Sequence, residues 1–98
     1  MNFSQWQADV LALLADSPIT AAAVVRDVTE SVHVGEVGLA FDTLCSWIYE
    51  DSLPISRSFH ERLTGLAVDL EEVGSVEKLD ELIADEAMSP GGPGPTVN

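Results

Sequence analysis

The residues of this 98-residue chain that could do chemistry are few and scattered. Neither of the two histidines, His33 and His60, has a second histidine or a cysteine one helical turn away, so no zinc-ligand set is visible. Cys45 is the only cysteine, which excludes a disulfide within the chain. It falls on the flank of a predicted helix, and we interpret it as a small buried hydrophobic residue rather than a nucleophile.

The other patterns that resemble catalytic motifs are incomplete. Gly35 and Gly38 open a predicted helix but lack the lysine and the flanking strand of a phosphate-binding loop, so we interpret them as a turn. Glu71 and Glu72 form an adjacent acid pair on a polar helix face, where carboxylates are usually solvated. No nucleophile elbow is present. The sequence therefore predicts a protein that is not an enzyme, with no cofactor and no bound metal.

A better candidate for a functional site lies on a predicted helix at residues 36–51. At about 100° per residue, acidic, hydroxyl and aromatic side chains share a stripe opposite the predicted core face. Tyrosine beside carboxylates suits recognition, because the ring supplies contact area at low entropic cost and the acids pair with arginine or lysine. The alternative is a solvated face with one tyrosine packed on a neighbouring loop. The predicted partner-binding residues are Asp42, Ser46, Trp47, Tyr49, Glu50 and Asp51.

The charge of the chain also favours binding to a partner. Seventeen acidic residues against four basic ones give a net charge of −13. Such a field repels nucleic acid and anionic membranes, and it attracts basic partners and speeds their association. The alternative is that the acidity only keeps a small protein soluble. The hydrophobic fraction of 46% is ordinary for a folded protein, so the acid content does not imply general disorder.

Apolar residues that recur every three or four positions predict an all-α fold, a small bundle of four to five helices. Consecutive helices 36–51 and 56–73 are expected to run antiparallel and to share an interface. Their predicted interface residues are Phe41, Leu44, Ile48, Phe59, Leu63 and Leu66. The predicted helices span residues 4–16, 20–34, 36–51, 56–73 and 76–87.

Several local features leave alternatives open. The valines of the second helix also permit a strand at 24–28, although their spacing is not two. Thr20 is a plausible N-cap of that helix, and Gly35 is a natural residue after its end. The fourth helix has two possible N-caps, Ser56 and Ser58. Gly65 in its middle would be explained by a close approach of another helix.

Residues 1–87 are predicted to form one domain and residues 88–98 a disordered tail rich in proline and glycine. No signal peptide is expected, because no basic segment precedes an apolar stretch at the N-terminus, and no apolar run approaches the roughly 18 residues that a membrane span needs. The expected location is the cytoplasm.

The stretch from Gly35 to Glu50, followed by Pro54-Ile55-Ser56 and Leu63, resembles the MafI-type immunity proteins of bacterial polymorphic toxin systems. The shared features are a glycine that opens a helix, an Ala-x-x-x-Leu-Cys core, a Tyr-Glu ending and a Pro-Ile-Ser cap on the next helix. The resemblance covers roughly residues 8–73.

This resemblance implies a small helical protein that binds and neutralises a cognate toxin domain, often a nuclease, by stoichiometric occlusion. The acidity agrees with that role, because a protein that blocks a basic nucleic-acid cleft should present carboxylates. The resemblance assigns no contact residues. The alternative function is an acidic helical adaptor or regulator of a basic protein unrelated to toxins.

Overall fold

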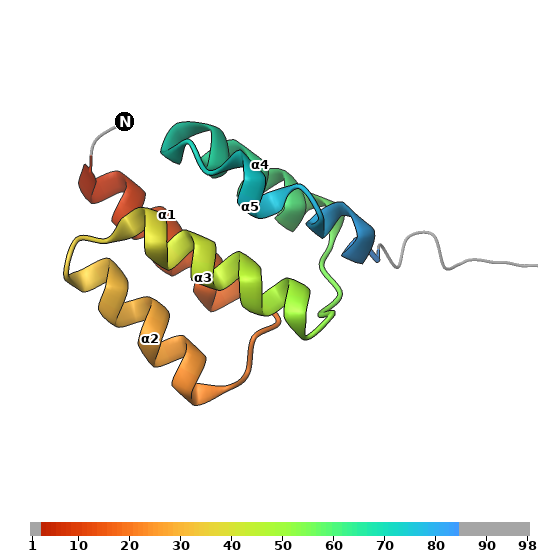
Figure 1. Cartoon of the computed structure of the whole chain (residues 1–98), viewed down its shortest axis with the longest axis horizontal. Coiled ribbons are helices and arrows are strands. Elements are labelled where there is room, and N and C mark those ends of the chain that lie inside the picture. Colours follow the sequence, from red (N-terminus) through yellow and green to blue (C-terminus); the bar gives the residue numbers. More distant parts are fainter. Residues whose placement is uncertain (1–2, 85–98) are drawn as a thin grey trace, which may run out of the picture.

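The computed structural model of the chain describes residues 3–84, and within this range the regular structure is helical (Figure 1). The prediction of an all-α bundle is confirmed. Four helices of 12 to 14 residues are followed by one short helix and one 3₁₀ turn. The elements are α1 (Phe3–Asp16), α2 (Ala22–His33), α3 (Val37–Glu50), α4 (Arg57–Leu70), α5 (Val73–Val76) and η1 (Leu79–Leu82).

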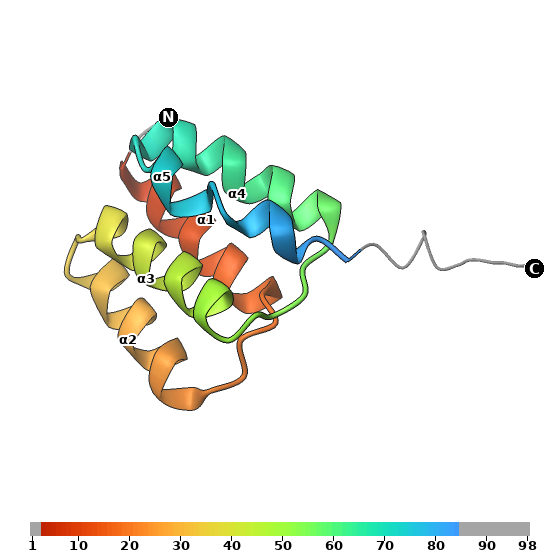
Figure 2. The same ribbon diagram turned by 45° about the vertical axis from the view of Figure 1, so that its right-hand side comes forward.

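Helix α3 is the centre of the bundle. It packs against α1 and α2 on one side and against α5 and η1 on the other, while α4 lies on α1 and α5 (Figures 1 and 2). Helices α3 and α4 run antiparallel as predicted, but their backbones do not approach closely along their length, and α4 packs mainly on α1 and α5. Helix α5 packs on both α3 and α4. The six predicted interface residues are nonetheless all buried, in one common core.

The core of the described residues is entirely apolar. Helix α3 contributes more buried residues than any other helix, and these include the fully buried Phe41, Leu44 and Ile48. Its buried set follows the predicted stripe with Cys45 added: Val37, Ala40, Phe41, Leu44, Cys45 and Ile48. Cys45 is buried as predicted.

The helix ends show which local signals the chain uses. Ser56 is the N-cap of α4, because its Oγ accepts a hydrogen bond of 3.0 Å from the backbone N–H of Phe59. Gly35 follows the end of α2 with φ of +90°, as predicted. The predicted cap at Thr20 is wrong, because α2 begins two residues later. Ile19 packs against the core, and the chain stays extended as far as Ala21.

Residues 24–28 lie inside α2, so the helix is formed rather than the alternative strand. Gly65 does not mark a close helix approach. No atom lies within 4 Å of the position that a Cβ would take there, and the glycine lines an open groove between α1 and α4.

The prediction of a continuous last helix at residues 76–87 is wrong within the described range. Helix α4 ends at Leu70, Glu71 adopts a left-handed conformation with φ of 59°, and the short α5 begins at Val73. Val73, the last residue of the predicted helix 56–73, therefore begins a separate short helix and is exposed. The chain then forms η1 and pairs with the α3–α4 loop: the N–H of Ile55 donates to the carbonyl of Leu82 at 3.1 Å, and the N–H of Ala84 to that of Ile55 at 2.8 Å.

The spacing of the apolar residues explains this difference. Val76, Leu79 and Leu82 recur every three residues, which matches a 3₁₀ turn, whose side chains stack at that interval. Both Val76 and Leu79 are buried against the core. The predicted end of this helix near Ala87 and the predicted tail at 88–98 lie outside the described residues.

None of the helices in residues 3–84 combines the length and the apolar character that crossing a membrane requires.

Removing the side chain of Leu44 should destabilise the protein strongly, because Leu44 is fully buried at the centre of α3. Leu44→Ala is expected to lower the free energy of unfolding by about 2–5 kcal/mol, measured by urea denaturation. Leu39→Ala is the matched control, since Leu39 lies on the same helix and is 53% exposed. Its effect should stay within about 0.5 kcal/mol, and equal losses in the two variants would contradict this packing.

The two candidate caps of α4 can be separated by mutation. Ser56→Ala removes the acceptor for the N–H of Phe59 and should cost about 1 kcal/mol of stability. Ser58→Ala should cost less, because the Ser58 hydroxyl contacts only that of Ser56, at 3.2 Å. A larger loss in the Ser58 variant would show that α4 begins at the alternative cap.

Candidate functional site

The six predicted partner-binding residues all lie on the surface, along the outer side of α3 and at its end. Asp42, Ser46, Glu50 and Asp51 are exposed, and the rings of Trp47 and Tyr49 are 41% and 37% exposed. Helix α3 runs from Val37 to Glu50, and Asp51 is its C-cap. The helical period therefore brings these side chains together as the sequence predicted.

These residues line two adjoining hollows. The first lies between α3 and α5 and has a volume of about 190 Å³. The second lies at the end of α3 and has a volume of about 270 Å³. Ser46 and Glu50 line both, so the hollows form one continuous surface. We call this the α3 surface: Asp42, Ser46, Trp47, Tyr49, Glu50 and Asp51.

The first hollow already contains contacts within the chain. The Ser75 hydroxyl donates a hydrogen bond of 2.8 Å to Oδ1 of Asp42, which ties α5 to α3. The ammonium of Lys78 lies 5.4 Å from the centre of the Tyr49 ring, a cation–π contact. This side of α3 is therefore less free of intramolecular contacts than the sequence predicted. Tyr49 does pack against a neighbouring loop, the alternative considered above, although part of its ring remains exposed.

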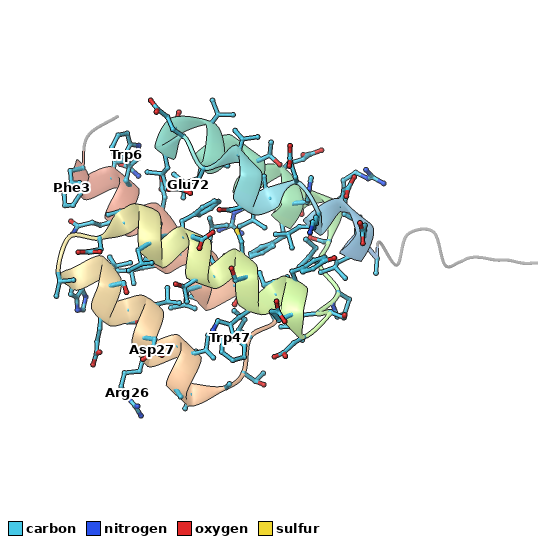
Figure 3. All side chains as sticks on the ribbon, in the orientation of Figure 1. Phe3, Trp6, Arg26, Asp27, Trp47 and Glu72 are labelled. Atoms are coloured by element: carbon cyan, nitrogen blue, oxygen red, sulfur yellow. The ribbon has the colours of Figure 1, made fainter. Side chains whose placement is uncertain are left out.

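The second hollow has no cation among its lining residues. Trp47 supplies an aromatic wall, and Glu50 and Asp51 supply two carboxylates. Figure 3 shows Trp47 on the side of α3 that faces the beginning of α2. An arginine or lysine from another protein could place its charge beside the carboxylates and its stem or guanidinium against the indole ring.

The position of these acids does not favour the helix itself. Glu50 is the last residue of α3 and Asp51 caps it, at the end where the helix dipole is negative. The last turn contains no basic residue, and the first turn contains no acidic one. Each carboxylate at such an end costs roughly 0.3–1 kcal/mol at low salt. Glu50 and Asp51 are thus present despite a small loss of stability.

Sequence reasoning missed Ser75 and Lys78 as parts of this surface. Ser75 precedes the predicted helix at residues 76–87, and Lys78 lies within it. A continuous helix there does not predict the contact of either residue with α3. The three-residue spacing of Val76, Leu79 and Leu82 was the signal that could have found it.

The potential catalytic residues remain apart from one another. His33 ends α2 and is exposed, whereas His60 is half-buried in the first turn of α4. Among residues 3–84, no group of three or more histidine, cysteine, aspartate or glutamate side chains is placed to hold a metal ion. Burial, reinforced by the charges of Asp42 and Glu72, raises the pKa of the Cys45 thiol from 9.0 to about 12.

Comparisons of the chain with protein-family models, with curated proteins and with solved structures find no match. The resemblance to MafI-type immunity proteins therefore stays a prediction.

The buried Cys45 should be inert in the native protein. A thiol-reactive dye should leave it unmodified near neutral pH and label it once urea unfolds the chain, because only the thiolate reacts and burial disfavours it. Rapid labelling of the folded protein would contradict this assignment.

The same thiol should make stability depend on alkaline pH. The folded state holds the proton up to about pH 12, while the unfolded state releases it near pH 9.0. Stability from this group is complete below the unfolded pKa and is lost as pH rises through that window. Cys45→Ala should remove this component of the decline, as measured by urea denaturation across the same pH range.

Proposed function

We propose that this protein is a bacterial immunity protein that binds a cognate toxin domain and neutralises it by stoichiometric occlusion. The α3 surface is the proposed contact, and the partner is a toxin domain with a basic surface, such as a nuclease. In this role the protein acts in the cytoplasm of the cell that makes the toxin, and it does no chemistry.

The observation that carries this proposal is the composition of the α3 surface. Two partly exposed aromatic rings, Trp47 and Tyr49, stand among three exposed carboxylates around two adjoining hollows. Aromatic residues are the commonest anchors of binding energy in interfaces, and carboxylates select basic partners. The net charge of −13 extends the same preference over a longer distance.

The two kinds of residue should act on different steps of binding. Exposed carboxylates accelerate the encounter with a basic partner and make it sensitive to salt. The aromatic rings should act mainly on dissociation, because their contact area forms only in the docked complex. Trp47 is the better anchor of the two rings, because Lys78 already lies over Tyr49.

The alternative function is an acidic helical adaptor or regulator of a basic protein unrelated to toxins. The same surface would serve it, so the partner distinguishes the two. A large secreted protein with a variable C-terminal domain, encoded just upstream, supports the immunity function. Co-expression with that C-terminal domain should then yield a stable complex on purification and protect the cells. A folded toxin domain that kills cells despite co-expression would reject the immunity function.

Reversing the two acids at the end of α3 should weaken binding while leaving the fold more stable. Glu50→Lys with Asp51→Lys changes the net charge from −13 to −9, since each change adds two positive charges. It also replaces carboxylates by cations at the negative end of the dipole, so unfolding should cost about 0.5–1 kcal/mol more. Binding should weaken by at least about 2 kcal/mol, roughly thirtyfold, as measured by calorimetry.

The matched control is Asp27→Lys with Glu30→Lys, which makes the same change in charge at exposed positions of α2. Its effect on affinity should be several-fold smaller. Asp42 is left unchanged in both variants, because a change there would also break its hydrogen bond with Ser75. Equal losses in the two double variants would show that only net charge matters, and full protection by the first variant would exclude the α3 surface.

A further inference from the structure

One end of the bundle holds a further hollow, separate from the two hollows of the α3 surface. The start of α1, the turn between α2 and α3 and the end of α4 meet there, at the left of both ribbon views (Figures 1 and 2). The hollow has a volume of about 340 Å³. We call it the end hollow: Phe3, Trp6, Gly35, Glu36, Val37, Gly38, Asp69, Leu70 and Glu71.

The lining of the end hollow combines aromatic rings with unpaired carboxylates. Phe3 and Trp6 come from α1, as Figure 3 shows, and Glu36, Asp69 and Glu71 add three acids from two other segments. The carboxylates of these acids have no ion pair or hydrogen bond within residues 3–84. The lysine and arginine residues of the chain stand at positions 26, 57, 62 and 78, and none of them lines the hollow.

Several exposed apolar residues belong to helix ends near this hollow. Seven large hydrophobic residues are exposed in the described part of the chain, and five of them belong to the segments that meet at this end. These five are Phe3, Val34, Leu39, Val68 and Val73. Apolar side chains gathered at one end of a protein are more typical of an interaction site than single, scattered ones.

A further polar group at this end lacks a partner. The indole Nε1–H of Trp6 is buried and has no acceptor among the described residues. Buried donors are nearly always paired, so this unpaired indole is an unusual feature of the residue that lines the hollow.

We propose that the end hollow binds an arginine side chain that a protein partner presents between apolar residues. A guanidinium stacks on aromatic rings and pairs with carboxylates, and the hollow supplies both kinds of group. The apolar neighbours of the arginine would cover exposed apolar residues at this end of the bundle. This site does not depend on the function proposed for the α3 surface.

The two tryptophans of the chain provide separate reporters, because Trp6 lines the end hollow and Trp47 lines the α3 surface. The experiment titrates the full-length, ¹⁵N-labelled protein with a capped pentapeptide that has a central arginine between two leucines. A matched peptide carries citrulline, which keeps the shape of arginine without its charge. Proton–nitrogen correlation spectra then follow the indole signals and the amides of Gly35 and Gly38.

The arginine peptide should shift the Trp6 indole and the two glycine amides along one saturable curve, and the citrulline peptide should not. Asp69→Asn with Glu71→Gln should weaken this binding about tenfold. The control, Asp80→Asn with Glu81→Gln, removes the same charge from η1 at the other end of the bundle and should change affinity less than about twofold. An unchanged melting temperature for both variants establishes that the fold is intact.

The proposal would be overturned by no saturable shift of the Trp6 indole, by equal shifts with both peptides, or by equal losses of affinity in the two double variants. A shift confined to the Trp47 indole would likewise reject the end hollow, and it would leave the function proposed for the α3 surface standing. Conversely, binding at Trp6 with no toxin partner for the protein would support the end hollow alone.

Discussion

The burial of α3 is the constraint on which the rest of the structure depends. Helices α1, α2 and α5 and the 3₁₀ turn η1 all pack against it. Its apolar stripe contains three of the largest fully buried side chains of the described residues, Phe41, Leu44 and Ile48. No disulfide supplements this packing. The ion pair between Arg62 and Asp16, at 3.0 Å, is exposed and contributes little. The apolar core must therefore offset the mutual repulsion of a chain with a net charge of −13.

Few of the acids support the helices. Among the described residues, no α-helix has an acidic residue in its first turn, where the dipole would favour one, although Glu36 and Glu72 are the N-caps of α3 and α5 and η1 has Asp80 and Glu81 in its first turn. Glu50 and Asp69 stand instead in the last turns of α3 and α4, and Glu71 follows the end of α4. Four of the acids on these two surfaces, Glu50, Asp51, Asp69 and Glu71, are thus at unfavourable helix ends, whereas Glu36 is the N-cap of α3 and Asp42 lies within that helix. This arrangement supports a role in binding, because general solubility would be served equally well by acids at the other ends.

The sequence predicted the parts of this fold that repeat at helical spacing. The buried face of α3 follows from Val37, Phe41, Leu44 and Ile48, and the same spacing places the candidate residues on the opposite side. The prediction from the sequence failed where short-range backbone geometry decides the path of the chain. The chain turns at Glu71 in a left-handed conformation and then follows a three-residue spacing after Val76. This path brings Ser75 and Lys78 onto α3, a contact that helical periodicity does not predict. The end hollow was missed for a related reason: its lining comes from three separate segments, and their meeting depends on the packing of α1 with α4.

The geometry of α3 also fixes how the two candidate surfaces relate. The end hollow includes Val37 and Gly38 in the first turn of this helix, and the second hollow of the α3 surface includes Glu50 at its last residue. Fourteen helical residues separate these ends by about 20 Å, since each residue adds about 1.5 Å. A typical interface covers about 800 Å² on each partner, so one partner is large enough to contact both surfaces. Because a packed helix holds the two hollows at a fixed distance, a partner whose basic side chains match that spacing would bind without reordering either site. A partner with a different spacing would reach only one of them, and the rigid core would then act as a selector among basic proteins of similar charge.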